Sequence, residues 1–188
     1  MKPGRGKAKG SAFEREICKA LSLWVTHGEK DDCFWRSAIS GGRATVARKK
    51  GKVVRQDGDI TAVSPEGHSL TDRFFIECKH VKKLGLDQFL VKRTGLLAEF
   101  WKKAREQSGT KWPIIIAKQN QWPILVISEV GGLVGLTLPP RIPLISHRSA
   151  EIWLLGSILR HPYRVPERDP IAKAYFDDFA KNNPQGKK

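Results

Sequence analysis

The stretch that most constrains the fold is Arg73 to Val81, which reads RFFIECKHV. It is rich in Phe, Ile and Val and lies between turn signals, which predicts a β-strand. Because side chains alternate between the two faces of a strand, Glu77 and Lys79 share one face. A carboxylate beside an ammonium group in an apolar segment is costly unless the two groups are paired or used. This strand therefore marks a candidate site.

A second acidic residue lies in a strand-like segment upstream. Residues 57–63 read DGDITAV, and Pro65-Glu66-Gly67 indicates a turn after them. We expect this segment and the strand at 73–81 to pair as a β-hairpin. Such a hairpin would bring Asp59 close to Glu77 and Lys79.

Two carboxylates and a lysine on neighbouring strands suit metal-assisted hydrolysis of a phosphodiester. Carboxylates are hard oxygen ligands for Mg²⁺, and the bound metal neutralises phosphate charge and lowers the pKa of a water molecule. Lys79 would position that water or stabilise the transition state. The alternative is an ordinary ion pair of Glu77 with Lys79 on an exposed edge strand, with Asp59 as a turn residue. These three residues alone do not decide between the two interpretations.

The charge of the chain favours a polyanionic partner. The sequence contains 34 Lys and Arg residues against 19 Asp and Glu, a formal net charge of +15. The excess is concentrated in residues 1–10 and 43–55, which contain no acidic residue. A generally basic, solvated surface would also account for the composition. Nucleic acid is favoured because the second basic cluster immediately precedes Asp59.

An amphipathic helix is predicted to begin at Ser11. The sequence Ser11-Ala12-Phe13-Glu14 fits a capping box, and apolar residues then recur at helical spacing as far as Trp24. Glu14 lies at the edge of the apolar face. It is either a capping residue only or a third carboxylate directed at the metal site.

The remaining pattern predicts an α/β protein. Strands are expected at residues 33–37, 113–118 and 123–127, and a helix from Leu96 to Ser108. Helices would pack on one central sheet. In residues 40–52, small residues beside arginines suit close approach to a phosphate backbone, or form an ordinary flexible loop.

The predicted organisation is a flexible basic arm at residues 1–10, a core at 11–127, and a C-terminal extension at 128–188 packed on that core. Residues 151–159 are expected to form a short helix or strand. Asp169-Pro170 is expected to start a helix, and the tail from Asn182 to be disordered.

The three cysteines lack metal-ligand spacing, which fits a reducing cytoplasm. The sequence has no secretory signal and no apolar run approaching the roughly 18 residues of a membrane helix. We therefore expect a cytoplasmic protein of a bacterial, archaeal or phage-infected cell.

Together these residues resemble the PD-(D/E)xK nuclease superfamily. Within it, residues 9–16, KGSAFERE, look like the start of archaeal-type Holliday junction resolvases. That family begins with a glutamate on its first helix, followed by a strand, a small Ser/Gly loop, an Asp strand and an ExK strand. The resemblance covers residues 7–118, and its matching positions are Glu14, the 37–42 loop, Asp59, and Glu77 with Lys79.

This resemblance implies a restriction-endonuclease-like core, with a central mixed β-sheet flanked by helices. It implies a homodimeric endodeoxyribonuclease that uses Mg²⁺, or alternatively Mn²⁺, on branched DNA. The implied catalytic residues are Glu14, Asp59, Glu77 and Lys79. The implied metal ligands are Asp59, Glu77 and the carbonyl of Cys78. The candidate DNA-binding residues are Lys7, Lys9, Ser37, Ser40, Arg43, Arg48, Lys49, Lys50 and Lys52.

The sequence departs from the superfamily pattern in three places. Gly58 stands where a proline often precedes the aspartate, the basic insertion at 43–55 lengthens the loop, and the last sixty residues match nothing in the pattern. Two other functions therefore stay open. One is a nuclease of the same fold that cuts duplex or single-stranded DNA in repair, restriction or phage genome processing. The other is a non-catalytic DNA-binding protein with a nuclease-like fold.

Overall fold

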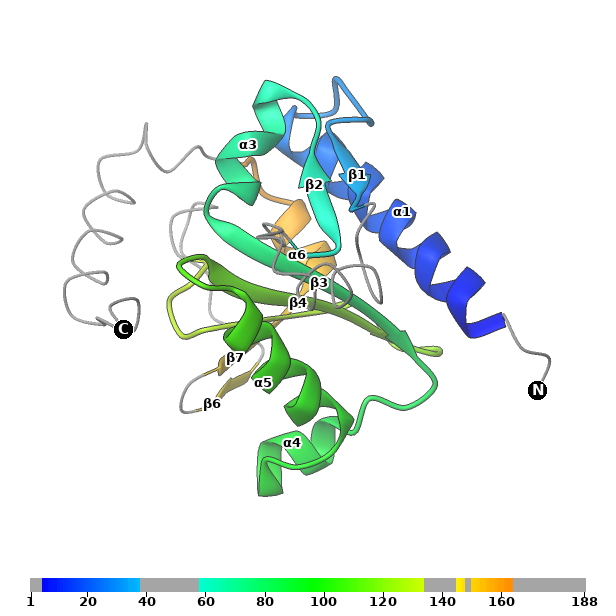
Figure 1. Ribbon diagram of the computed structural model, residues 1–188, viewed down its shortest axis with the longest axis vertical. Helices are drawn as coiled ribbons and strands as arrows, with labels where there is room; N and C mark the ends of the chain where they lie inside the picture. Colours follow the sequence, from blue (N-terminus) through cyan, green and yellow to red (C-terminus); the bar gives the residue numbers. More distant parts are fainter. Residues whose placement is uncertain (1–4, 38–57, 134–144, 148–149, 164–188) are drawn as a thin grey trace, which may run out of the picture.

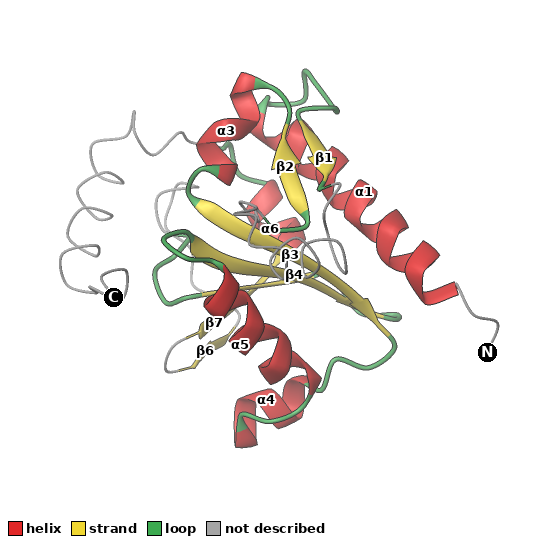
Figure 2. Ribbon diagram, in the orientation of Figure 1, coloured by secondary structure: helices red, strands yellow, loops and turns green. Residues whose placement is uncertain are grey.

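The computed structural model describes residues 5–37, 58–133, 145–147 and 150–163. These residues form a five-stranded sheet with helices on both faces and a two-stranded sheet beside it (Figure 1). Figure 2 shows the same arrangement with helices and strands distinguished by colour. This is the helix-flanked α/β architecture that the sequence predicts.

The larger sheet has the strand order β3-β4-β5-β7-β6. Strands β3 and β4 are parallel neighbours, whereas the other pairs are antiparallel. The strands are β3 Phe74–Val81, β4 Trp112–Gln119, β5 Leu125–Ser128, β6 Ile145–His147 and β7 Ala150–Leu154. The smaller sheet pairs β1 (Phe34–Arg36) antiparallel with β2 (Ile60–Ala62).

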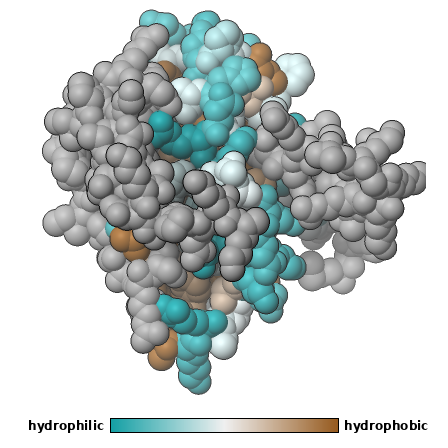
Figure 3. All heavy atoms as spheres, turned by 60° about the vertical axis from the view of Figure 1, so that its left-hand side comes forward, coloured by the Kyte–Doolittle hydropathy of each residue, from teal (hydrophilic) through white to brown (hydrophobic). Residues whose placement is uncertain are grey.

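Helices pack on both faces of the larger sheet. One face is covered by α1 (Arg5–Val25) and α6 (Leu155–Leu159), and the other by α4 (Leu86–Lys92) and α5 (Leu96–Gln107). Helix α3 (Pro65–Thr71) connects β2 to β3. None of the helices in the described part of the chain is long and apolar enough to cross a membrane. The described residues visible in Figure 3 are mostly hydrophilic, with hydrophobic side chains at isolated positions.

The period-two pattern of β3 divides its side chains between two hydrophobic cores. Phe74, Ile76 and Cys78 pack in the core beneath α1, whereas Phe75 packs in the core beneath α5. Burial of each large apolar side chain stabilises the fold by about 1.5–3 kcal/mol. Because Glu77 and Lys79 continue the alternation of Phe75, they lie on the α5 face of the sheet.

The start of the first helix differs from the prediction. Helix α1 begins at Arg5, so the flexible arm predicted for residues 1–10 is wrong for residues 5–10. Ser11 lies inside the helix and is not its N-cap. Arg5, Lys7, Ala8 and Lys9 are good helix formers, but Gly6 and Gly10 are poor ones, so helix propensity alone does not account for the extension toward the N-terminus. The predicted apolar face is present, and its side chains Phe13, Ile17, Leu21 and Trp24 are buried.

The predicted hairpin between residues 57–63 and 73–81 is wrong. The expected turn at Pro65 is the first turn of α3, and β2 pairs with β1 instead of β3. The crossover through α3 returns the chain so that β3 runs in the same direction as the segment at Gly58, and Gly58 meets Ile76 in an isolated parallel bridge. The segment that carries Asp59 therefore still approaches β3, although by a different connection.

The described part of the C-terminal extension belongs to the main sheet. Strand β7 lies between β5 and β6, and Trp153 and Leu155 are buried in the cores. Residues 150–159 form both a strand and a helix, where one or the other was expected. The predicted boundary at residue 127 falls within β5, so the core and the extension share one sheet. The helix predicted from Asp169 and the tail from Asn182 lie outside the described residues.

Candidate active site

Asp59 lies at the fork where the chain leaves the edge of β3 to form β2. Its N–H donates a 2.8 Å hydrogen bond to the carbonyl of Ile76, and its own carbonyl accepts a 2.9 Å hydrogen bond from the N–H of Ser37. The backbone of Asp59 is therefore held between the larger and the smaller sheet. This tether fixes the position of its carboxylate relative to β3.

Gly58 permits the close approach that makes this fork. Its φ is +84°, and a Cβ atom there would lie 2.3 Å from the carbonyl oxygen of Ile76. A glycine adopts this conformation without steric penalty, whereas the proline ring fixes φ near −65°. The departure from the superfamily's proline before Asp59 thus has a physical reason in this chain.

The structure brings Asp59, Glu77 and Lys79 together. The Lys79 ammonium lies 3.5 Å from Oδ2 of Asp59 and forms an ion pair with Oε1 of Glu77. The exposed fractions of the three side chains are 11% for Asp59, 20% for Glu77 and 24% for Lys79. Lys79 Nζ also lies 5.7 Å from the ring centroid of Phe100 on α5, within the range of a cation–π contact. The three charges therefore meet in a site that is largely removed from water but open enough to reach.

Proximity and burial perturb these groups in a consistent way. Burial, followed by the negative charge of Asp59, raises the pKa of Glu77, although the Lys79 ammonium opposes this effect. Burial alone would lower the pKa of Lys79, but the carboxylates of Asp59 and Glu77 outweigh it and raise the pKa. Lys79 is thus held as a cation, and the two carboxylates create a negative potential that a further cation would relieve.

The backbone of Cys78 serves the site, whereas its thiol does not. Its N–H donates a 2.9 Å hydrogen bond to Oδ2 of Asp59. The N–H and C=O of one strand residue point to the same side, so the Cys78 carbonyl also points toward Asp59 and away from β4. The thiol is buried in the core beneath α1, and burial raises its pKa well above the ordinary value. Only the carbonyl oxygen is therefore suited to ligate a metal.

These oxygen atoms fit a hard divalent cation. Two carboxylates and a carbonyl at the fork form the kind of donor set that Mg²⁺ and Mn²⁺ prefer. Within the described ranges, no group of three or more His, Cys, Asp or Glu side chains is arranged to hold a metal. The predicted ligand set, with two carboxylates and one backbone oxygen, is compatible with that finding.

The predicted third carboxylate, Glu14, is held by an arginine that the sequence reasoning missed. Oε2 of Glu14 lies 2.6 Å from Nε of Arg36, the last residue of β1. The charge of Glu14 is among the effects that raise the pKa of Glu77, which places Glu14 within electrostatic range of the site. Arg36 pairs with a residue 22 positions earlier, so no local pattern could have shown this contact.

The predicted DNA-binding residues fall into two groups. Lys7 is exposed on α1, and the Lys9 ammonium donates a hydrogen bond to Oδ1 of Asn120. Ser37 lies next to the site, with its Oγ 2.6 Å from Oγ1 of Thr61. The remaining predicted residues lie outside the described part of the chain: Ser40, Arg43, Arg48, Lys49, Lys50 and Lys52.

The sequence reasoning also missed that Lys9 and Lys118 lie near His80. His80 of β3 contacts Phe13, with the ring centroids 5.3 Å apart. Burial, followed by the charges of Lys9 and Lys118, lowers the pKa of His80. The Lys118 ammonium lies 3.3 Å from Oε1 of Glu16. The alternation of β3 was the available signal, because it places His80 on the same face as Cys78, beneath α1.

A mixed sheet flanked by helices, with an aspartate at the fork and an ExK motif on the edge strand, defines a nuclease of the PD-(D/E)xK superfamily with a restriction-endonuclease-like fold. Residues 5–141 match the family described as "Phage putative PDDEXK endonuclease". That match covers well over half of the chain, and the chain belongs to this family. No curated protein and no solved structure matches the chain.

Proposed function

We propose that the protein is a divalent-metal-dependent endonuclease that hydrolyses DNA phosphodiester bonds at the Asp59–Glu77–Lys79 site. The observation that carries the proposal is the meeting of these three charges at the fork, in a chain that belongs to an endonuclease family. A non-catalytic DNA-binding protein would have no need to hold two carboxylates and a lysine together in a largely buried site.

Asp59, Glu77 and the Cys78 carbonyl would hold the metal, with Mg²⁺ the first candidate and Mn²⁺ an alternative. A bound divalent cation supplies charge neutralisation at the phosphate and lowers the pKa of water. The protein's own part is to fix the ligands: the Cys78 N–H orients Asp59, and the ion pair with Lys79 orients Glu77. Lys79, held as a cation, would position the attacking water or stabilise the charge that develops on the phosphate.

Glu14 is proposed as a third carboxylate that acts directly or through water. Its pairing with Arg36 keeps it ordered at the side of the site and neutralises its charge while no DNA is bound. Arginine binds phosphate oxygens as readily as carboxylates. A DNA phosphate near Arg36 would therefore compete for the guanidinium and free Glu14 to face the metal site.

DNA is proposed to be bound mainly through its phosphates. The net charge of +15 provides long-range attraction. Lys7 and Lys9 on α1, Ser37 beside the site, and the basic residues of the 38–57 segment are the candidate contacts. Backbone contacts of this kind position the duplex without reading its sequence.

The proposed substrate is a four-way junction cut by a homodimer. The support is the resemblance of residues 7–118 to archaeal-type resolvases, together with the need for two symmetric nicks, which a two-fold dimer supplies. Apolar side chains near the end of the chain, such as Trp153 and Leu155, could have formed such an interface, but they are buried in the monomer. The second candidate is a nuclease that cuts duplex or single-stranded DNA in phage genome processing, and the description of the matched family favours it.

One experiment tests the activity and separates the two substrates. The purified protein is incubated with four-way, flap, duplex and single-stranded DNA in the presence of Mg²⁺, Mn²⁺ or EDTA. Cleavage that requires the metal supports the nuclease function, and cleavage in EDTA would contradict it. Preference for the junction together with twice the 21.1 kDa chain mass in light scattering supports the resolvase. A monomer that cuts duplex as readily as junctions would leave the second candidate.

A further inference from the structure

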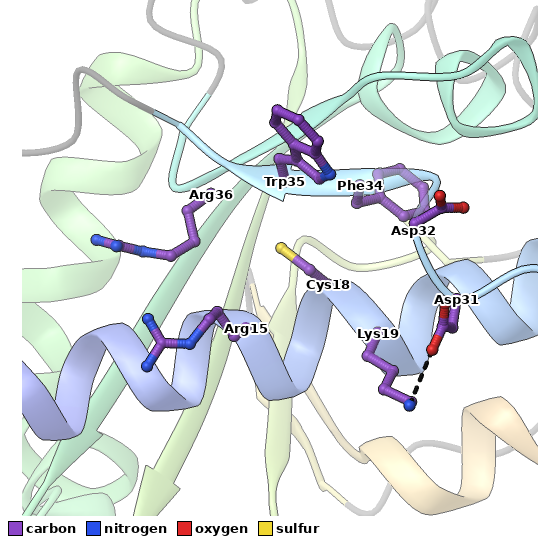
Figure 4. A pocket seen from close by; sticks show the side chains of 8 residues that line it. All are labelled: Arg15, Cys18, Lys19, Asp31, Asp32, Phe34, Trp35 and Arg36. Atoms are coloured by element: carbon purple, nitrogen blue, oxygen red, sulfur yellow. Dashed lines mark ion pairs between the residues drawn. The ribbon is translucent and has the colours of Figure 1, made fainter.

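A groove of about 360 Å³ lies beside the ion pair of Glu14 with Arg36, along α1 and β1 (Figure 4). Cys18 of α1 and Phe34 of β1 contribute its apolar lining, and both are buried. The volume falls at the lower end of the range of about 300–1,000 Å³ that is typical of small-ligand sites. The groove therefore suits a ligand the size of one nucleotide, and it is too small for a duplex.

Trp35 lines the groove and is the most exposed tryptophan among the described residues, at 64%. A large aromatic ring that stays exposed to water on a short strand does not stabilise the fold through burial. Aromatic rings on nucleic-acid-binding surfaces commonly stack on unpaired bases, which stabilises binding by about 1–3 kcal/mol per base. The exposed ring is thus suited to a nucleobase.

The charges along the groove are arranged for a phosphate at one end. Figure 4 shows the guanidinium groups of Arg15 and Arg36 extending to the same side, whereas Asp31 and Asp32 lie at the opposite end. Lys19 is neutralised by Asp31, with the two charged atoms 2.9 Å apart. Among the described residues, Arg15 has no ion-pair partner. A phosphate is therefore attracted to the arginine end by Arg15 and would compete with Glu14 for Arg36, whereas Asp32 repels it from the other end.

The groove is linked to the proposed active site through Arg36 and Ser37. Arg36 lines the groove and holds Glu14, and the next residue, Ser37, donates its N–H to the carbonyl of Asp59 at 2.9 Å. We propose that the groove holds one unpaired nucleotide of the DNA substrate next to the cleaved bond, with its base stacked on Trp35 and its phosphate bound by Arg15 and Arg36. This inference rests on the proposed function, and it assigns the enzyme to DNA that carries unpaired nucleotides, such as flaps, tails and open junctions.

The test compares two labelled DNAs by fluorescence anisotropy in EDTA, where the proposed chemistry is absent. One is a blunt duplex, and the other is the same duplex with a short single-stranded tail. Trp35→Ala is expected to weaken binding of the tailed DNA by about 5- to 140-fold, which is the stacking energy converted at 1.4 kcal/mol per tenfold. Binding of the blunt duplex should stay unchanged, and Trp35→Phe should keep most of the affinity for the tail. Trp122→Ala, which removes another exposed tryptophan at the β4–β5 turn, is the matched control.

An equal loss on both DNAs, or no loss on the tailed one, would overturn the assignment. A second measurement decides the matter should Trp35→Ala fail to fold, as checked by circular dichroism. A tail that contains 5-iodouracil should photo-crosslink to the peptide that carries Trp35 in the unmodified protein, and crosslinking confined to other peptides would contradict the proposal. The two proposals fail separately: tail-selective binding without cleavage rejects only the nuclease, and metal-dependent cleavage without tail selectivity at Trp35 rejects only the groove.

Discussion

The backbone N–H of Cys78 donates a 2.9 Å hydrogen bond to Oδ2 of Asp59. The side chain of Asp59 thereby takes the place of a neighbouring strand along the free edge of β3. Because the same oxygen lies 3.5 Å from the Lys79 ammonium, one carboxylate is oriented by both the backbone and a charge. A carboxylate held in this way would lose little conformational entropy when a metal binds, which is the property expected of a preorganised site.

Replacing Asp59 or Glu77 by alanine is expected to abolish DNA cleavage while DNA binding survives. Loss of a metal ligand removes a stabilisation of several kcal/mol, so turnover should fall by at least about 10³-fold. Single-turnover cleavage and anisotropy measure the two effects separately. Asp87→Ala, which removes an exposed carboxylate from α4, should leave cleavage unchanged. Full activity in Asp59→Ala would exclude this site.

Lys79→Ala is expected to lower turnover by on the order of 10²-fold or more with little change in DNA affinity, because the ammonium stabilises charge that develops in the transition state. The measurement is the cleavage rate at saturating DNA. Lys103→Ala removes an exposed lysine from α5 and serves as the control. A Lys79 variant that binds weakly but cuts normally at saturation would make Lys79 a phosphate contact instead.

Gly58→Ala is expected to disrupt the fork. The added Cβ would lie 2.3 Å from the Ile76 carbonyl oxygen at a φ of +84°, so the chain must move away from β3. Strain of this kind costs on the order of 1–3 kcal/mol of unfolding free energy, and cleavage should fall because Asp59 moves as well. Denaturant unfolding and cleavage rates measure the two effects.

The control for this substitution is Gly10→Ala in α1. Nothing lies within 4 Å of the position where its Cβ would be, and alanine is the better helix former by about 0.5–1 kcal/mol. The control should therefore be neutral or stabilising. Unchanged stability and cleavage in Gly58→Ala would show that the fork tolerates a displaced backbone.

Metal binding is expected to strengthen as the pH rises above the usual carboxylate range. The pKa of Glu77 in the folded protein lies above its ordinary value of 4.5. Its contribution to the stability of the metal-free protein is therefore fully present below pH 4.5 and is lost as the pH rises through the raised pKa. A metal binds the ionised form and reverses this loss, so the rise in Tm caused by Mn²⁺ should grow with pH across that window.

Differential scanning fluorimetry with and without Mn²⁺ at several pH values measures this rise. In Glu77→Gln, which cannot ionise, the metal-induced rise should be smaller and should lose this pH dependence. A Tm shift in the unmodified protein that does not vary with pH would show that Glu77 is not a ligand.

The dependence of DNA affinity on salt concentration should show whether the basic residues at 43–55 contact DNA phosphates. Phosphate contacts release counterions, so log K falls linearly with log salt concentration. The double substitution of Lys49 and Lys50 by alanine should reduce the slope by up to about two units. Lys102→Ala with Lys103→Ala, on the exposed face of α5, is the matched control. An unchanged slope in the first variant would place the DNA elsewhere.

The acidic and basic residues of the site could be predicted because their pattern is local. Alternation along β3 puts Glu77 and Lys79 on one face regardless of what surrounds the strand. The proximity of Asp59 was also predicted, but through a hairpin that does not exist. The sequence from Pro65 carries both a turn signal and a helix start, because proline is favoured in the first turn of a helix. Only the tertiary structure decides between them.

The contacts missed from the sequence are nonlocal. Arg36 is an unremarkable basic residue until β1 places it over Glu14. The start of α1 was misjudged because a capping box at Ser11 competes with helix-forming residues before it, and the longer helix also brings Lys9 to Asn120. Likewise, residues 150–154 gave no sign that they would enter the sheet between β5 and β6.

The fork at Asp59 has a consequence for when the site forms during folding. Asp59 is positioned by Ile76, Cys78 and Ser37, none of which can orient it until β1, α3 and the edge of β3 are all in place. The sheet behind that edge is complete only when β7, nearly a hundred residues beyond Asp59, has inserted beside β5. A nascent or partly unfolded chain would carry the same carboxylates but scatter them. The proposed nuclease would thus acquire its cutting ability only once these elements are assembled, and nuclease activity would serve as a sensitive measure of native structure.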